Sequence, residues 1–390
     1  MNTFDIVIIG GGALGTFHAY HALQKGLSVA LLEKDQQPQS ATVRNYGQII
    51  PSGLNAQWQK YGRRSLEIYK EIQAQTDITL RNNGTVYLAS NDKEAQLLEE
   101  MAVINAGNQY HSSLLTADQC LDRYEGLRKD YVKSGLFFPE EATIEPRLAV
   151  HRIRAFLIEQ FHLAYFPNHL AVDVHSQNGK ASIKCANGTS FEATKVIVCS
   201  GSEFKLLFPE RFQACDLMGV KLQMMQTGPQ PSQFIKGAIM TGRSIRRYES
   251  FHECPSYQAI KSQEKSNSLD KEWDIHLSFK QALDGSVIIG NSHRSADAKD
   301  IDELGYEIEQ EINAHMLAQA KEIFELQNWN IQRYWHGMYS QCKDSDLYQE
   351  DVDDHIHIVT GIGGKGITGS AGFAEENMDR IMGSLASLFF

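Results

Sequence analysis

The chain begins with two apolar runs separated by a helical pattern. Residues 6–9 form the first apolar run, and residues 13–25 repeat apolar positions at helical spacing. A second apolar run at 28–32 follows Gly26 and ends at Glu33. Two short buried strands joined by a helix are typical of a parallel βαβ unit. We therefore expect an α/β fold that starts with such a unit.

A similar pattern returns near the end of the chain. Residues 355–360 indicate a strand, 361–366 a glycine loop and 367–385 a helix. Between the two ends, apolar and polar residues alternate at 220–226 and 275–290, which is typical of antiparallel strands. We expect further helices at 55–75, 92–105, 148–161 and 302–326, and further strands at 84–89, 169–174, 181–185 and 195–199.

The two nucleotide-type segments lie at opposite ends of the chain, so the domain that they build is expected to be discontinuous. The expected architecture is a Rossmann-like domain with an inserted antiparallel-sheet domain for the substrate. We assign 1–83, 145–219 and 330–390 to the Rossmann-like domain. The inserted substrate domain is then formed by 84–144 and 220–329.

The first glycine turn has the spacing of a dinucleotide-binding loop. Gly10 permits the tight turn, Gly12 lets the backbone approach a phosphate, and Gly15 lets the helix pack closely on the sheet. The helix that starts with Ala13 and Leu14 offers N–H groups and a positive dipole end to a pyrophosphate. The alternative is a glycine turn that binds no ligand.

Glu33 lies 18 residues after Gly15, at the end of the second apolar run. A carboxylate at this place accepts hydrogen bonds from ribose hydroxyls and disfavours a 2′-phosphate. NADP is therefore not expected, whereas NAD and FAD both remain open on this motif alone.

Composition narrows the class of protein. The 390 residues carry a formal net charge of −11, which disfavours nucleic acid as a partner. The six cysteines form no CxxC pair, and we expect reduced thiols and no metal site. No apolar stretch approaches the length of a membrane span, and no signal peptide is evident, so we expect a cytoplasmic protein without a membrane span.

The glycine loop near the end of the chain needs a role other than pyrophosphate binding, since one dinucleotide has one pyrophosphate. In flavin enzymes a helix N-terminus stabilises the negative charge that reduction places on the pyrimidine edge of the ring. Lys365 adds a positive charge there, although a solvated loop lysine is the plainer alternative. The candidate contacts in this loop are Gly363, Gly364, Lys365, Gly366, Ile367 and Thr368.

Four segments together carry a resemblance to a known family. They are 10–15 with Glu33 and Lys34; 42–47, with Thr42, Arg44, Asn45 and Gly47; 196–201, ending at Gly201; and 361–368. On these segments the chain resembles the D-amino-acid oxidase, glycine oxidase and sarcosine oxidase family of FAD-dependent oxidoreductases. The resemblance implies a glutathione-reductase-like FAD domain, with 42–47 passing over the flavin, backbone near Val172 at the adenine, and Gly201 beside the pyrophosphate loop.

Within that family the chain is similar to a bacterial subgroup linked with phosphonate breakdown. The similarity rests on 44–49, 247–251, 254–256 and 290–293. It implies a substrate of the aminoethylphosphonate type and makes Gln48 a candidate substrate contact.

The resemblance also assigns roles to single residues. His293 aligns with an active-site histidine of sarcosine oxidases, and Tyr339 with a tyrosine that faces substrate; a structural role for His293 is the alternative. Gly337 stands where those relatives attach flavin through a cysteine, so we expect non-covalent FAD. Cys342 is near that place but out of register. Lys365 corresponds to a lysine implicated in oxygen reactivity, which suggests an oxidase.

An arginine is expected to bind the anionic group of the substrate, because a guanidinium matches carboxylate and phosphonate oxygens. If 243–249 is a strand, Arg246 and Tyr248 share one face, and Arg243 and Arg247 share the other. Either face is a candidate, and exposed arginines without a ligand are the alternative.

The expected function is the FAD-dependent oxidation of a small anionic amine, with O₂ or another electron acceptor taking the electrons. Hydride transfer from the carbon next to nitrogen to flavin N5 is followed by hydrolysis of the imine. A second hypothesis changes the substrate to a D-amino acid, glycine or sarcosine. A third is a flavoprotein that carries electrons without oxidising amines.

Overall fold

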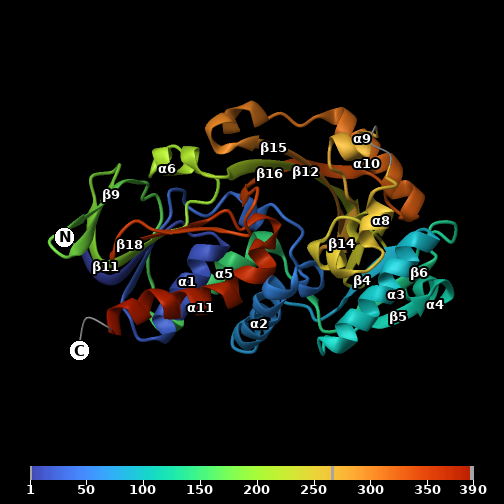
Figure 1. Ribbon diagram of the computed structural model, residues 1–390, viewed down its shortest axis with the longest axis horizontal. Coiled ribbons are helices and arrows are strands. Elements are labelled where there is room, and N and C mark those ends of the chain that lie inside the picture. Colours follow the sequence, from blue (N-terminus) through green and yellow to red (C-terminus); the bar gives the residue numbers. More distant parts are fainter. Residues whose placement is uncertain (1, 265–267, 387–390) are drawn as a thin grey trace.

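The computed structural model describes residues 2–264 and 268–386. Within these ranges the strands form two eight-stranded sheets and one two-stranded ribbon. Figure 1 shows the first sheet at the left, near both chain ends, and the second sheet toward the top and right. The expected α/β fold with an inserted, mainly antiparallel sheet is confirmed.

The first sheet has β1 (Asn2–Ile9) near its centre. β1 pairs in parallel with β2 (Val29–Leu32) and with β11 (Ser190–Val198). β11 pairs in parallel with β18 (Ile356–Thr360), so a late segment of the chain completes the sheet that the first residues begin. The other strands of this sheet are β8 (Ala164–Phe166), β9 (Ala171–Gln177), β10 (Lys180–Cys185) and β17 (Tyr348–Asp351).

Helices cover one face of the first sheet (Figure 1). α1 (Ala13–Gln24) packs against α5 (Pro146–Phe161) and α11 (Gly366–Ala386), and α11 packs against α2 (Ala56–Gln73). Alternate residues of β1 belong to two different hydrophobic cores, one on each face of the sheet. This burial on both faces explains the unbroken apolar run in the sequence.

The second sheet covers the other half of the molecule. Its strands, in spatial order, are β16 (Ile331–Cys342), β12 (Leu217–Pro229), β15 (Ser286–Asp297), β14 (Ser278–Gln281), β13 (Ala238–Met240), β4 (Thr85–Ala89), β6 (Ser134–Phe138) and β5 (Ser113–Thr116). Neighbouring strands are antiparallel except β13 and β4. The long helices α3 (Asp92–Gly107) and α10 (Gln310–Ile323) pack against it.

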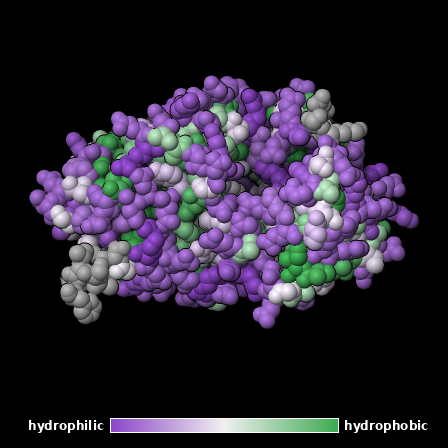
Figure 2. All heavy atoms as spheres, viewed as in Figure 1, coloured by the Kyte–Doolittle hydropathy of each residue, from purple (hydrophilic) through white to green (hydrophobic). Residues whose placement is uncertain are grey.

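The remaining elements are shorter. They are β3 (Gln48–Ile49), β7 (Ala142–Thr143), α4 (Ala117–Arg123), α6 (Pro209–Ala214), α7 (Gly242–Ile245), α8 (Tyr257–Lys261), α9 (Leu269–Glu272), η1 (Ala41–Val43), η2 (Pro51–Gly53), η3 (Glu249–Glu253), η4 (Ala298–Leu304) and η5 (Gly363–Lys365). Figure 2 shows that the face seen in Figure 1 is mostly hydrophilic, with apolar side chains in small patches.

β16 is a long strand that the sequence pattern does not predict. It pairs with β12 in the second sheet, although the sequence division gives 330–390 to the Rossmann-like domain. Gln332 and Arg333 are adjacent and both exposed, which hides the alternation at the start of the strand. The division that gives 84–144 and 220–329 to a substrate domain stays a prediction, and β16 is a strand of the second sheet that this division leaves out.

Two other segments differ from expectation. Residues 243–249 do not form a strand, because α7 and the turn after it bend this segment, with Ser244 N–H donating to Thr241 O. Residues 302–326 are not one helix: η4 and α10 are separated at Gly305, whose φ of +56° no continuing helix accepts.

Candidate functional site

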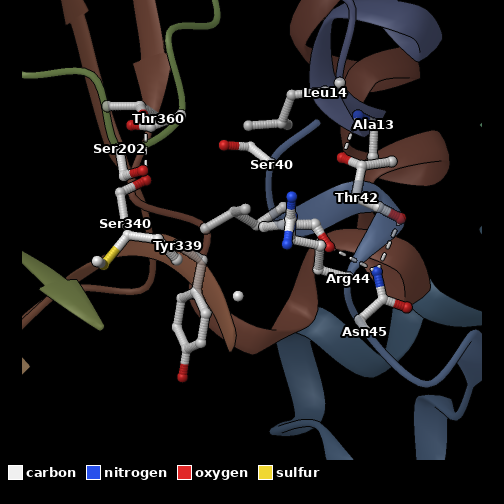
Figure 3. A pocket seen from close by; sticks show the side chains of 18 of the residues that line it. Ala13, Leu14, Ser40, Thr42, Arg44, Asn45, Ser202, Tyr339, Ser340 and Thr360 are labelled. Carbon is white, nitrogen blue, oxygen red and sulfur yellow. Dashed lines mark hydrogen bonds between the residues drawn. The ribbon is translucent and has the colours of Figure 1, made fainter. Parts of the chain in front are cut away.

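A cavity of about 1070 Å³ is lined by residues of both sheets. The first-sheet side supplies the β1–α1 turn, the end of β2 and the loop before α11. The second-sheet side supplies parts of β12, β15 and β16. Figure 3 shows Ala13 and Thr42 on one side of this cavity, and Tyr339 and Thr360 on the other.

The glycine turn forms one end of the cavity and leaves no room for side chains at two positions. A Cβ on Gly10, where φ is +105°, would lie 2.2 Å from the carbonyl oxygen of Cys199. A Cβ on Gly15 would lie 1.9 Å from the carbonyl oxygen of Gly10. At Gly12 a Cβ would come within 3.1 Å of Thr42 Oγ1 and would narrow the cavity.

The start of α1 is suited to an anion. Its N-cap is Gly12, which provides no side-chain cap, and its first turn contains no acidic residue. Ala13 N–H donates to Thr42 Oγ1 over 3.0 Å, which ties the helix start to the loop that follows β2 (Figure 3). Backbone N–H groups at a helix start and the positive end of the helix dipole attract phosphate oxygens.

Glu33 is fixed at the end of β2. Its Oε2 accepts a hydrogen bond from Gly11 N–H over 2.9 Å, and its Oε1 accepts one from Asp35 N–H over 3.1 Å. The residue is buried and lines the cavity. The carboxylate retains acceptor capacity for a sugar hydroxyl, because each oxygen offers two lone pairs.

The segment around Arg44 joins the two sheets. Arg44 Nη1 donates to the carbonyl oxygen of His336, and Trp335 Nε1 donates to the carbonyl oxygen of Arg44 over 3.0 Å. Asn45 closes the local turn by donating to Thr42 O and accepting from Gly47 N–H. The loop is therefore held rigidly along the cavity.

Lys365, at the far glycine loop, does not extend alone into the cavity. Its Nζ lies 3.0 Å from Asp346 Oδ1 and 3.3 Å from Glu249 Oε1. It also lies 5.6 Å from the centre of the Trp58 ring. Two carboxylates against one ammonium leave an excess of one negative charge, instead of the free positive charge that the sequence suggests.

Asn55 organises these two carboxylates. Its Oδ1 accepts from Trp58 N–H and caps α2, so its amide orientation is fixed. The Nδ2 group then donates to Glu249 Oε2 and to Asp346 Oδ2, both over 3.1 Å. We call Asn55, Glu249 and Asp346 the lysine clamp.

His293 lies at the second-sheet end, with both ring nitrogens engaged. Nδ1 lies 2.9 Å from the backbone oxygen of Asp274, and Nε2 lies 3.2 Å from Asn291 Nδ2. The ring stacks on His276, with centroids 5.5 Å apart. Burial and the nearby Arg247 guanidinium lower the pKa of His293 well below its usual value, so its ring is neutral.

Arg247 stands beside this histidine pair. Its Nη2 donates to Asp274 Oδ2 over 2.7 Å, and its side chain is 31% exposed and lines the cavity. Burial lowers the pKa of Arg247, whereas the Asp274 carboxylate and the neighbouring Tyr339 and Tyr248 raise it, and the net shift of that pKa is upward. Burial raises the pKa of the Tyr248 and Tyr339 phenols to about 12, so both hydroxyls keep their protons.

Five buried polar atoms of residues that line the cavity have no hydrogen-bond partner within the described residues. They are Tyr46 Oη, Gln48 Nε2, Ser200 Oγ, Asn291 Oδ1 and Ser370 Oγ. Buried polar groups are normally paired, so unpaired ones in a cavity wall indicate a bound ligand. Asn291 is in β15 of the second sheet, and Tyr46 and Gln48 lie at β3, whereas Ser200 follows β11 and Ser370 is in α11.

Most of the expected site residues line the cavity. They are Gly10, Gly12, Ala13, Leu14, Gly15, Glu33, Lys34, Thr42, Arg44, Asn45, Gln48, Gly201, Arg247, Tyr248, His293, Gly337, Tyr339, Gly363, Gly364, Lys365, Gly366, Ile367 and Thr368. Three expected residues are absent from the lining: Gly47, Val172 and Arg246.

Each of those three has another place in the structure. A Cβ on Gly47 would lie 2.2 Å from Ile144 O, so this glycine serves the packing of the loop. Val172 is 38% exposed, and the neighbouring strand residue Ala171 lines the cavity instead. Arg246 pairs with Glu94 and Glu264, away from the cavity.

The sequence pattern misses several residues that line the cavity or hold its side chains. They are Tyr46, Asn55, Asp274, His276, Asn291 and Asp346. Asn55 is detectable as a helix N-cap, and Asn291 lies within the 290–293 segment, but neither role follows from spacing. These side chains meet only through the pairing of distant strands.

Neither a metal centre nor a membrane span is found in the described part of the chain. Among residues 2–264 and 268–386, no cluster of three or more His, Cys, Asp or Glu side chains is placed to hold a metal ion. Over the same residues, no helix combines the length and the apolar character needed to cross a bilayer.

Comparison with curated proteins shows distant relatives along most of the chain. An opine oxidase subunit of Rhizobium meliloti is 22% identical over 358 residues, which cover 88% of this chain and 84% of that protein. Glycine oxidase of Bacillus licheniformis is 25% identical over 219 residues, which cover 53% of this chain and 56% of that protein.

Solved structures show the same fold. Glycine oxidase from Geobacillus kaustophilus superposes with a TM-score of 0.77 at 15% identity, covering 98% of this chain and 95% of that one. L-α-glycerophosphate oxidase from Mycoplasma pneumoniae, solved with FAD bound, gives a TM-score of 0.79 at 18% identity, with 98% and 95% covered.

A family model covers nearly the whole chain. Residues 5–380 match the model of the DAO family, described as FAD dependent oxidoreductase. This range includes both glycine loops and the second sheet between them. The chain therefore belongs to the DAO family of FAD-dependent oxidoreductases.

Proposed function

We propose that this chain oxidises a small amine that also carries an anionic group. Relatives named glycine oxidase, sarcosine dehydrogenase and N-methyl-L-tryptophan oxidase support the amine class. The observation that carries the anionic part is Arg247, whose guanidinium lines the cavity while Asp274 holds it. A guanidinium has five N–H donors, so those beyond the Asp274 contact remain for a carboxylate or phosphonate.

The residues present fit FAD. The start of α1, which has no acidic residue in its first turn, and the glycine cradle suit a pyrophosphate, and Glu33 suits a ribose. When bound, FAD supplies an acceptor for the hydride equivalent that leaves the carbon next to nitrogen. The loop at 363–368, at the start of α11, is proposed to hold the flavin ring.

We also propose that the FAD is held without a covalent bond. Gly337 has no thiol, and Cys342 is buried outside the cavity lining. Acid precipitation should release the yellow cofactor into the supernatant. Colour that stays with the protein pellet would contradict this.

The side chains at the second-sheet end bind and orient the substrate. Arg247 receives the anion, and the Tyr248 and Tyr339 phenols line the wall as uncharged groups. His276 and His293 are weak bases, because burial lowers the pKa of each. The substrate amine therefore enters a wall that adds little positive charge beyond Arg247.

The finer substrate is proposed to be of the aminoethylphosphonate type, on the segments that resemble the phosphonate-linked subgroup. Glycine, sarcosine or a D-amino acid is the alternative, since a guanidinium also binds a carboxylate. O₂ or another electron acceptor completes the turnover.

An anaerobic substrate panel tests these proposals. Aminoethylphosphonate, glycine, sarcosine and D-alanine are each mixed with the oxidised holoenzyme, and loss of flavin absorbance is followed. Bleaching by the phosphonate alone supports the finer proposal, and bleaching by a carboxylate supports the alternative. A flavoprotein that no amine bleaches is instead an electron carrier.

Arg247→Met tests the anion site. Truncating a charged group that binds an anion costs about 2 kcal/mol or more, so kcat/KM should fall at least about thirtyfold. Arg294→Met is the control, because Arg294 is in β15 of the second sheet but pairs with Glu309 at the surface. An equal loss in both variants would remove Arg247 from the site.

A further inference from the structure

The hydrogen bonds of His293 fix its tautomer. Nδ1 faces the backbone oxygen of Asp274, which can only accept, so Nδ1 carries the proton. The buried ring is neutral, which leaves Nε2 with a lone pair. Nε2 is therefore an acceptor at 3.2 Å from the Asn291 amide.

This tautomer fixes the amide of Asn291. The NH₂ group must face His293 Nε2, because an amide oxygen there would meet a second lone pair. The backbone of Asn291 is also fixed, since it exchanges N–H···O bonds of 2.7 and 3.1 Å with His276. The amide cannot shift along the strand, and its Oδ1 is turned away from His293.

Asn291 Oδ1 is a buried acceptor without a protein partner. The residue is 5% exposed and lines the cavity, and Oδ1 has no hydrogen bond within the described residues. Tyr46 Oη, which is also unpaired, lies nearby, since it is 3.3 Å from the Cβ position of Gly290. Asn291 Oδ1 makes this part of the wall complementary to a ligand that donates a hydrogen bond, and the protonated Tyr46 hydroxyl can donate or accept one.

We propose that Asn291 Oδ1 accepts a hydrogen bond from the substrate nitrogen and makes the site selective for amines. This inference rests on the proposed function. A neutral amide suits amine oxidation better than a carboxylate, because a carboxylate would stabilise the protonated amine, which cannot lose a hydride readily. His293 acts through Asn291 and is a positioning residue.

The test compares ligands that differ only in an amino group. 2-Aminoisobutyrate and pivalate differ by NH₂ against CH₃, as do 2-amino-2-methylpropylphosphonate and 2,2-dimethylpropylphosphonate. The carbon that bears nitrogen has no hydrogen, so none of them is oxidised. Dissociation constants are measured by titration calorimetry on the oxidised holoenzyme, and the two pairs separate a carboxylate site from a phosphonate site.

The wild-type protein should bind the amine of at least one pair about tenfold more tightly than its methyl analogue, as one hydrogen bond to a charged or polar donor allows. Asn291→Leu should abolish that preference while changing the affinity of the methyl analogue less than about twofold. Asn377→Leu is the matched control, because Asn377 makes the same kind of bond to a buried histidine outside the main cavity.

Three outcomes would overturn the inference. A wild-type protein without amine preference excludes it. Equal losses for both ligands place Asn291 in the fold or at the anion. Weaker FAD binding with an unchanged ligand ratio assigns Oδ1 to the cofactor. If the preference vanishes in Asn291→Leu but no amine bleaches the wild-type flavin, the binding inference stands and the proposed function fails.

A second pair of variants tests the positioning role of His293. His293→Leu removes the acceptor that orients the Asn291 amide and should weaken the amine preference. His293→Gln supplies an amide oxygen in its place and should restore most of it. Equal behaviour of the two variants would show that His293 does not orient Asn291.

Discussion

Two buried histidine–asparagine pairs, one in each half of the molecule, have the same bonds but different surroundings. In the first half, His18 Nδ1 bonds Leu14 O and Nε2 receives Asn377 Nδ2 over 2.9 Å. In the second half, His293 repeats this arrangement with Asn291. The difference lies in the amide oxygen: Asn377 Oδ1 accepts from Arg380 Nε over 3.0 Å, whereas Asn291 Oδ1 has no partner within the described residues.

The comparison separates a structural use of the pair from a binding use. Between α1 and α11, every atom of the Asn377 amide is engaged by protein, and the pair joins two helices. In the cavity wall, the same pair leaves one acceptor open. The glycine turn and the substrate end of the cavity also differ in what forms them. The turn is formed by backbone, whereas the substrate end is formed by side chains, some of which have unpaired hydrogen-bonding atoms.

The largest effect on stability is expected at the position of the first half that leaves the least room for a side chain. Gly15→Ala places a Cβ 1.9 Å from a backbone oxygen, so folding and FAD binding should be lost, at a cost above about 3 kcal/mol. Gly107→Ala is the control, because nothing lies within 4 Å of its Cβ position. Urea unfolding measures the stability of each variant, and the flavin content of the purified protein measures its FAD binding. A yellow, stable Gly15→Ala protein would contradict the cradle.

Acid should destabilise the protein by protonating His18 of the His18–Asn377 pair. Burial lowers the pKa of His18 to about 4, so below pH 6.5 the unfolded chain binds a proton that the folded chain does not. Stability contributed by the neutral ring is complete above pH 6.5 and is lost as pH falls toward 4, by about 3 kcal/mol in total.

His18→Gln should flatten this dependence between pH 7.5 and 5, measured by urea unfolding. His175→Gln, at an exposed position, is the control. Identical pH slopes for the His18→Gln and wild-type proteins would show that another group controls acid unfolding.

The two asparagines should differ in what they stabilise. Asn377→Leu leaves Arg380 Nε and His18 Nε2 without this partner and should cost about 2 kcal/mol of unfolding free energy. Asn291→Leu removes a donor to His293 alone and should cost about 1 kcal/mol. Thermal and urea unfolding of the two variants compare them directly. A larger loss in Asn291→Leu would mean that its oxygen already serves the fold.

The smallest effect is expected at the lysine clamp. Asn55→Ser keeps a side-chain cap on α2 but removes the amide between Glu249 and Asp346, and should cost about 1 kcal/mol or less. The flavin absorption maxima should shift, because Lys365 moves relative to its carboxylates. Asn91→Ser, at the N-cap of α3, should match the stability loss without a spectral shift. Unchanged flavin spectra in both variants would show that the lysine clamp does not affect the flavin.

The sequence predicts what adjacent residues build and misses what distant strands bring together. The βαβ unit and both glycine loops follow from local apolar runs and glycine spacing. β16 is hidden by its exposed first residues, and the 243–249 segment has strand-like composition but forms α7 and a turn. Lys365 is visible as a charge, yet its compensation by Asp346 and Glu249 depends on three separate segments.

The pairing of β11 with β18 and of α1 with α11 has a consequence for synthesis of the chain on the ribosome. β1 and α1 emerge first, but the helix that covers α1 and the strand that completes the sheet are among the last segments translated. The apolar face of α1 therefore stays uncovered by α11 until most of the chain has been translated. The strands of the second sheet are translated during that interval. Nascent chains that stop before α11 should need chaperones and should bind no flavin.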